Sequence, residues 1–103
     1  MSTKKSNAMK DLESIYGKPL SFGTMMESIR LSDSYTQTEF AKKLSISATH
    51  LCDIEKGRKA VSVERAVKFA KILGYSKEQF VRLALQDQVD LSGIKLRVDV
   101  RAA

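Results

Sequence analysis

The sequence predicts an all-α domain of five helices followed by a short β-strand near its C-terminal end. Between Phe22 and Leu85 the apolar residues recur at spacings of three and four, the period of helices with one buried face. A serine or threonine that can cap a helix stands before each of these segments. After Gly93 the apolar residues alternate with charged ones, which is typical of a half-buried strand.

Length and charge narrow the class of protein. The 103 residues suffice for one domain with a small core. No apolar run approaches the roughly 20 residues of a membrane span, and the N-terminus lacks the apolar region of a secretory signal, so we expect a cytoplasmic protein without membrane contact. The net charge of +6 favours a polyanionic partner. The single cysteine, Cys52, allows neither an intrachain disulfide nor a thiolate zinc site, and we expect no metal or cofactor.

Three segments are predicted: a tail over residues 1–20, a helical domain over 21–88 and a C-terminal segment over 89–103. Residues 9–16 of the tail have the spacing of a short accessory helix, which ends at Gly17. Ser21 can cap the first helix of the domain, which ends near Ser32. The inward residues predicted for this helix are Phe22, Met25, Met26 and Ile29, with Leu31 as a further candidate.

Two short helices and a basic loop are predicted between Thr36 and Ala60. Thr36 and Glu39 form a capping box for the first helix, and Ser47 caps a second helix from Ala48 to about Lys56. Gly57 ends that helix, because glycine adopts the left-handed conformation without steric cost. One inward seam across the turn is predicted from Phe40, Ala41, Leu44, Ile46, Leu51 and Ile54.

Two further helices complete the domain. Ser62 caps the first and Gly74 ends it; Ser76 and Gln79 form a capping box for the second. The inward residues of the first are predicted to be Val63, Ala66, Val67, Ala70 and Leu73. Those of the second are Phe80, Val81, Ala84 and Leu85.

The stretch from Thr36 to Arg58 resembles the helix-turn-helix of the phage repressor and Cro (XRE) family. The resemblance rests on Thr36-Gln37, Glu39-Phe40-Ala41-Lys42-Lys43-Leu44, Ser47 and Ile54-Glu55-Lys56-Gly57-Arg58. It extends more weakly from Phe22 to Leu85, and it implies a lambda-repressor-like DNA-binding domain. Ser45 departs from the family, whose turn usually has glycine there. A serine at positive φ would cost on the order of 1 kcal/mol, so either the turn is slightly strained or its geometry differs.

The expected DNA contacts follow from the chemistry of each position. Ala48, Thr49 and Asp53, on the helix that enters the groove, are predicted to contact bases. The expected contacts with the DNA backbone are Gln37, Ser47, His50, Lys56, Arg58 and Lys59. The resemblance implies the same division of roles. It also implies an ion pair between Arg30 and Glu55; the alternative is two exposed charges that contribute little.

An enzyme is disfavoured. The one candidate cluster is His50, Cys52 and Asp53, but residues two apart on a helix point about 200° away from each other. The chain also lacks a glycine-rich phosphate loop and a paired-carboxylate cleft. We therefore expect no catalytic residues and no small-molecule substrate.

The C-terminal strand is predicted to join two chains. Its apolar face carries Ile94, Leu96, Val98 and Val100. A lone strand leaves its backbone groups unpaired, so the same segment of a second chain is the expected partner in a homodimer. The alternatives are a tail packed on the last helix or a disordered one.

Two functions remain open. The first is a sequence-specific double-stranded DNA-binding transcription regulator, a repressor that binds a palindromic operator as a dimer. The second is the antitoxin of a toxin–antitoxin pair, which binds a toxin protein and also regulates its own operon. The tail over residues 1–20 and the C-terminal strand would then contact the toxin.

Overall fold

The computed structural model describes residues 20–103, which contain five helices and confirm the all-α class. The accessory helix predicted over residues 9–16 lies outside the described residues. The last helix continues three residues past the boundary predicted at residue 88. The helices are α2 (Phe22–Ser32), α3 (Gln37–Leu44), α4 (Ala48–Glu55), α5 (Val63–Leu73) and α6 (Lys77–Leu91).

Every helix begins where its capping residue predicts. The hydroxyl of each cap accepts a hydrogen bond from the backbone N–H three residues later, and the caps are Ser21, Thr36, Ser47, Ser62 and Ser76. Thr36 and Glu39 form the predicted reciprocal box. At α6 the Ser76 hydroxyl donates to Glu78, 3.4 Å away. These local bonds satisfy N–H groups that a helix start leaves without partners.

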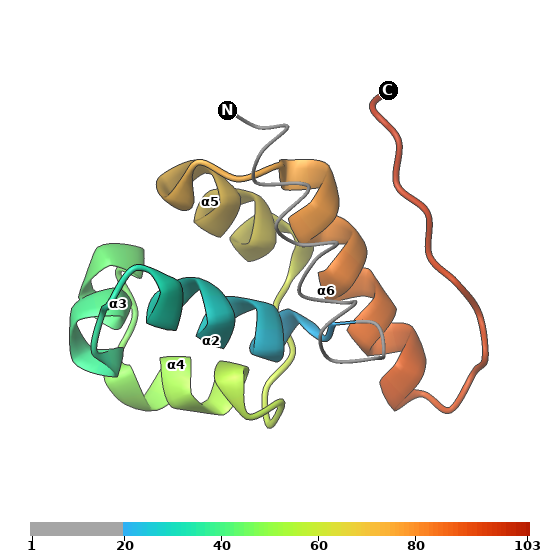
Figure 1. Cartoon of the computed structure of the whole chain (residues 1–103). Coiled ribbons are helices and arrows are strands. Elements are labelled where there is room, and N and C mark those ends of the chain that lie inside the picture. Colours follow the sequence, from blue (N-terminus) through green and yellow to red (C-terminus); the bar gives the residue numbers. More distant parts are fainter. Residues whose placement is uncertain (1–19) are drawn as a thin grey trace.

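The helices pack around one core, with α2 at its centre (Figure 1). Helix α2 contacts both α4 and α6, while α3 packs on α4 and α5, and α5 packs on α6. All four phenylalanines of the chain are buried, and Phe22 meets Phe80 edge-on with ring centroids 5.7 Å apart. Helix α2 therefore connects the α3–α4 pair to the α5–α6 pair.

The buried face of α5 differs from the predicted one. Val63 was expected inside but is 39% exposed, because it is the first residue of the helix and lies beyond the packed part. Phe69, which the prediction omitted, is only 1% exposed. Ala66 and Ala70 are buried as predicted. The small alanines leave room for the aromatic ring between α5 and its neighbours.

Of the two alternatives for the turn between α3 and α4, the structure has the strained one. Ser45 has φ 61° and ψ 40°, the left-handed conformation that glycine adopts freely. Its N–H donates to the carbonyl of Lys42, and the N–H of Ile46 donates to that of Ala41, 3.0 Å away. The last carbonyls of α3 are thus satisfied at the expense of a disfavoured serine conformation.

We expect Ser45→Gly to raise the free energy of unfolding by about 0.5–1 kcal/mol, because the left-handed penalty of about 1–2 kcal/mol is partly offset by the entropy that glycine adds to the unfolded chain. Urea denaturation followed by circular dichroism measures the change. Ser47→Gly is the control, since Ser47 has φ −74° and caps α4. The free energy of unfolding of Ser47→Gly should therefore not increase. A less stable Ser45→Gly protein would contradict the strain argument.

The C-terminal segment forms no strand within the described chain; it runs beside α6 instead (Figure 1). The side-chain amide of Gln86, which is 6% exposed, donates to the carbonyl of Leu96 and accepts from the N–H of Val98, each at 2.8 Å. One glutamine thus pairs with the tail as a neighbouring strand would. The expected strand is absent because the part of the chain that the structure describes offers the tail's backbone no strand to pair with.

The apolar face of this tail is open to solvent at Ile94 and Leu96 and partly buried at Val98 and Val100. Ile94 is 53% exposed and Leu96 is 64% exposed. Within one chain, the tail therefore lies on the last helix, as the first of the two alternatives to a strand pair predicted. Pairing of two tails from two chains stays a prediction.

Candidate nucleic-acid interface

The α3–α4 pair is held together by the predicted seam. Phe40, Ala41, Leu44, Leu51 and Ile54 are at most 1% exposed, and Ile46 packs against them while partly buried. The small side chain of Ala41 lets the two helices approach closely at the turn. The seam is therefore confirmed, and it leaves one side of α4 facing outward.

The outward side of α4 carries Thr49 and, three and four residues after it, Cys52 and Asp53. Thr49 is exposed, and the other two are partly buried. Ala48, which was predicted to contact bases, instead packs partly against the core. The sequence prediction did not include Cys52 on this outward face, although a position one turn after Thr49 is enough to assign it there.

An ion pair joins α2 to α4 behind this surface. Arg30 Nε lies 2.8 Å from Glu55 Oε2, and Arg30 Nη2 lies 3.1 Å from Glu55 Oε1. The two side chains are 11% and 1% exposed. The hydrogen bond to Glu55, opposed by burial, raises the pKa of Arg30. Arg30 and Glu55 thus form the ion pair that the resemblance implied.

Gln37 and Tyr35 complete the surroundings of this pair. Gln37 Nε2 donates to Glu55 Oε1 at 3.1 Å, and Arg30 Nη1 donates to the carbonyl of Tyr35 at 3.2 Å. Gln37, a predicted phosphate contact, therefore has its amide nitrogen directed toward the protein. Its main contribution in this structure is to connect the start of α3 to the ion pair.

The basic loop after α4 is organised by Asp53. Its carboxylate accepts from Arg58 Nε at 2.9 Å and lies 3.8 Å from Lys59 Nζ. Its carbonyl accepts from the backbone N–H of Arg58 at 2.8 Å. The hydrogen bond to Asp53, followed by that to Cys52, raises the pKa of Arg58. Asp53 was predicted to contact bases, but here its carboxylate is occupied by the loop, because Gly57 turns the chain back toward α4.

His50 lies against Arg65, which the sequence prediction missed. Arg65 Nη1 is 3.1 Å from Nε2 and 3.3 Å from Nδ1 of the imidazole. Burial, and then the positive charges of Arg65 and Lys59, lower the pKa of His50 below 6.5. Arg65 comes from the first turn of α5. The two residues are fifteen positions apart, and only the folding of the chain between α4 and α5 brings them together.

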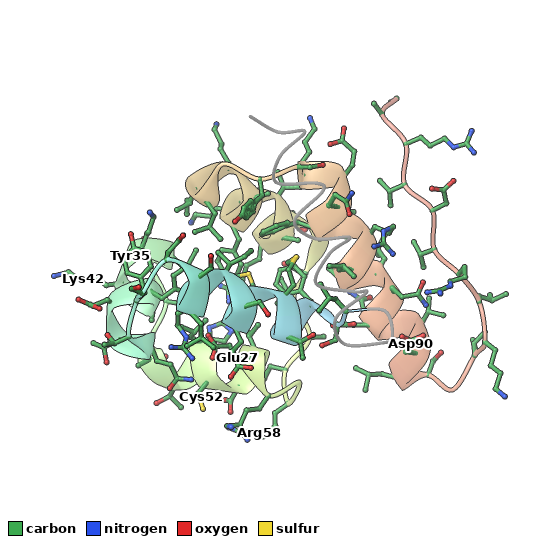
Figure 2. All side chains as sticks on the ribbon, viewed as in Figure 1. Glu27, Tyr35, Lys42, Cys52, Arg58 and Asp90 are labelled. Atoms are coloured by element: carbon green, nitrogen blue, oxygen red, sulfur yellow. The ribbon has the colours of Figure 1, made fainter. Side chains whose placement is uncertain are left out.

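Exposed cations border the α3–α4 surface. Figure 2 places Lys42 and Tyr35 at one end of this region, and Cys52 and Arg58 at the outer side of α4. Lys43 is held by Tyr35, with its Nζ 3.1 Å from the hydroxyl and 5.2 Å from the ring centroid. The exposed basic residues are Lys42, Lys43, Lys56, Arg58, Lys59 and Arg65. This distribution suits a helix that enters a groove between two phosphate backbones.

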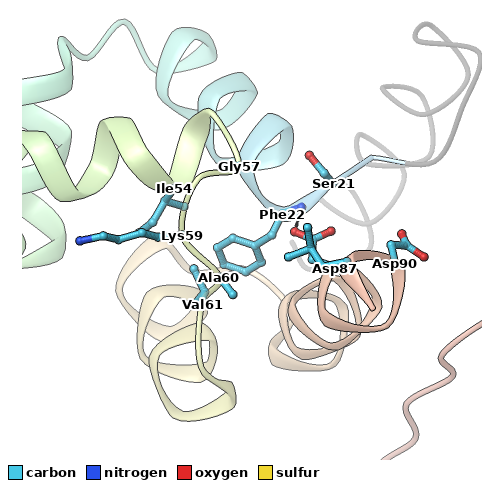
Figure 3. A pocket seen from close by; sticks show the side chains of 11 residues that line it. Ser21, Phe22, Ile54, Gly57, Lys59, Ala60, Val61, Asp87 and Asp90 are labelled. Carbon is cyan, nitrogen blue, oxygen red and sulfur yellow. Dashed lines mark hydrogen bonds between the residues drawn. The ribbon is translucent and has the colours of Figure 1, made fainter. Parts of the chain in front are cut away.

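A cavity of about 220 Å³ lies between the start of α2, the basic loop and the end of α6 (Figure 3). Asp87 accepts a hydrogen bond from the backbone N–H of Phe22 at 3.0 Å, so α6 caps the start of α2. Burial raises the pKa of Asp87, and the nearby Asp90 adds to this increase.

Over residues 20–103, no group of three or more histidine, cysteine or acidic side chains is arranged to hold a metal ion. None of the helices in that range is long and apolar enough to cross a membrane.

Two short helices joined by a tight turn, with a polar outward face and a basic border, define a helix-turn-helix DNA-binding domain. A family model described as helix-turn-helix matches residues 26–80, just over half of the chain. The chain belongs to this family, of the phage repressor and Cro (XRE) type, and is a DNA-binding transcription regulator. Searches of curated proteins and of solved structures found no match.

Proposed function

We propose that the protein is a sequence-specific repressor that binds a palindromic operator as a homodimer, with one α4 helix in each of two successive major grooves. The observation that supports this most is the outward face of α4, where Thr49 is exposed between flanking cations. Two-fold related helices enter one side of the duplex when half-sites lie about 10 bp apart.

The contacts divide according to what each side chain can reach. Thr49 offers a hydroxyl and a methyl group to base edges. Ser47 stands at the N-terminus of α4, where backbone N–H groups favour a phosphate. Lys56 and Lys59 are exposed and carry charge to the flanking backbone. Ala48 contributes its small size, because a larger residue would hold α4 away from the groove floor.

Selection of duplexes from a random library, with the mass of the protein measured in solution, tests this proposal. We expect a dimer and an enriched motif that contains two inverted half-sites about 10 bp apart. A reporter gene placed behind the selected site should be transcribed less when the protein is present. Enrichment of no motif by folded protein at moderate salt would refute sequence-specific binding.

We expect operator affinity to increase as the pH falls from 7.5 to 5.5. The pKa of His50 is lowered in the free protein, and a nearby phosphate would raise it, so binding takes up a proton. Each unit of pKa difference corresponds to about tenfold in affinity. Fluorescence anisotropy at constant ionic strength measures the change.

His50→Gln is the control for this pH dependence and should flatten the profile. The pKa of His50 is lower in the folded protein than in the unfolded chain. The stability that this difference contributes is present at a pH above the unfolded pKa and is lost as the pH falls through the folded pKa. Circular dichroism at pH 5.5 therefore checks that the protein remains folded. An equally steep profile for His50→Gln would assign the pH dependence to another group.

Deleting residues 94–103 is expected to weaken the dimer and to lower operator affinity by about 10²-fold or more through lost bivalency. Two tails that pair side by side would bury Ile94 and Leu96, which are exposed in the single chain. Analytical ultracentrifugation of full-length and truncated protein measures the change in dimer dissociation. A truncated protein that remains an equally tight dimer would place the interface elsewhere.

The same exposed tail supports the antitoxin as the second candidate function. A tail with the exposed apolar side chains Ile94 and Leu96 suits addition as an edge strand to the sheet of a toxin protein. A toxin encoded beside this gene and retained by the full-length chain, but released by the truncated one, would favour this function. Autoregulation of the shared operon would be compatible with repression.

A further inference from the structure

Arg58 follows the outward face of α4 back toward the middle of the helix. Its Nε donates to Asp53 Oδ1 at 2.9 Å, and its Nη2 lies 3.6 Å from Cys52 Sγ. These partners are five and six residues earlier in the chain. Figure 2 shows Cys52 and Arg58 together at the outer side of α4. The guanidinium group therefore lies on the same face as Thr49, which is one turn before Cys52.

Among residues 20–103, the hydrogen-bond partners of Arg58 lie along one edge of the guanidinium. Nε and one N–H of Nη2 face Asp53 and Cys52, which leaves Nη1 and the second N–H of Nη2 as two parallel donors on the outer edge. The side chain remains 56% exposed. In the major groove, guanine presents two acceptors, O6 and N7, and a bidentate arginine is the commonest specific contact with them.

We propose that Arg58 recognises a guanine in each half-site and that Asp53 is the positioning residue that orients it; this rests on the proposed function of sequence-specific DNA binding. Asp53 holds both ends of Arg58, through its carboxylate and through its carbonyl, which accepts from the Arg58 N–H at 2.8 Å. An arginine already held in place loses less conformational freedom on binding. The arrangement assigns a base contact to Arg58, for which the sequence predicted only a phosphate contact.

Lys59 provides the matched comparison. It is the next residue in the same loop, its side chain is 60% exposed, and its Nζ lies 3.8 Å from the other Asp53 oxygen. A lysine at this distance acts as a charge near the backbone, without the two-donor geometry that guanine requires. Removing Lys59 should weaken binding to all sequences alike, whereas removing Arg58 should change which sequences are preferred.

The test is selection from a random duplex library with the full chain and with Arg58→Ala, Arg58→Lys and Lys59→Ala. We expect the unchanged protein to require a guanine at one position of each half-site and to discriminate against its replacement by about 5- to 150-fold. Both Arg58 variants should lose the preference at that position alone. Lys59→Ala should keep the whole motif while its affinity falls. Substituting 7-deazaguanine at that position should weaken the unchanged protein and not Arg58→Ala.

Asp53→Ala tests the positioning role. Removing a negative charge near the phosphates should leave affinity for random DNA unchanged or higher, while discrimination at the guanine position falls. A merely structural role for Asp53 would lower both together, and circular dichroism checks the fold. Undiminished discrimination in Asp53→Ala would overturn the positioning role.

The remaining outcomes separate the two levels of the proposal. If Arg58→Ala selects the same motif as the unchanged protein and only binds it more weakly, Arg58 is a phosphate contact and the guanine assignment is wrong. If the unchanged protein selects no motif, the proposed function fails and the guanine assignment fails with it.

Discussion

Replacing Arg30 by methionine is expected to lower the free energy of unfolding by about 3–5 kcal/mol, because the substitution leaves the Glu55 carboxylate buried without its charged partner. Glu55 is only 1% exposed at its side chain, and it has two hydrogen bonds from Arg30 and one from Gln37. Methionine retains much of the length of the arginine stem. Urea denaturation, with the midpoint and slope measured separately, gives the change in stability.

The double variant Arg30→Met with Glu55→Met is the control for this prediction. When both charges are removed together, neither is left buried alone, and a well-packed apolar pair is often as stable as the ion pair it replaces. We expect the double variant to recover most of the loss. If Arg30→Met costs less than about 1 kcal/mol, the pair behaves like an exposed surface pair.

Gly23→Ala is expected to lower the free energy of unfolding by about 3 kcal/mol, at the upper end of overpacking costs. Gly23 lies where α2 crosses the end of α4. A Cβ added there would overlap the carbonyl oxygen of Ile54 and would lie 2.8 Å from that of Glu55. Both neighbours are backbone atoms that cannot rotate away, so α2 and α4 would have to separate. Thermal and urea denaturation measure the effect.

The direction of this effect is informative because alanine normally stabilises a helix interior relative to glycine by roughly 0.5–1 kcal/mol. Gly57→Ala is the comparison: Gly57 has φ 74°, and an added Cβ would meet nothing within 4 Å. Its cost of about 1–2 kcal/mol would come from backbone conformation alone. Were Gly23→Ala as stable as the unchanged protein, the close approach of α2 and α4 would not be required.

The helix starts and the helix-turn-helix itself could be predicted from the sequence because the interactions that define them are local. A cap such as Thr36 bonds to a residue three positions later, and the glycine that the family usually has at Ser45 raised a left-handed serine as one of two alternatives. The seam from Phe40 to Ile54 likewise depends on spacing within two adjacent helices. Residues that are close in the chain carry this information whatever surrounds them.

The partners of the functional side chains were decided only by tertiary packing. Gly23 gives no local signal, since its importance comes from a helix about thirty residues later in the chain. His50 meets Arg65, and Gln86 binds the tail, because separate helices bring them together. Asp53 was placed correctly on the outward face, but the return of Arg58 onto it depends on the path of the loop. A periodic pattern shows which face a residue occupies, whereas the hydrogen bonds made on that face depend on the three-dimensional arrangement of several elements.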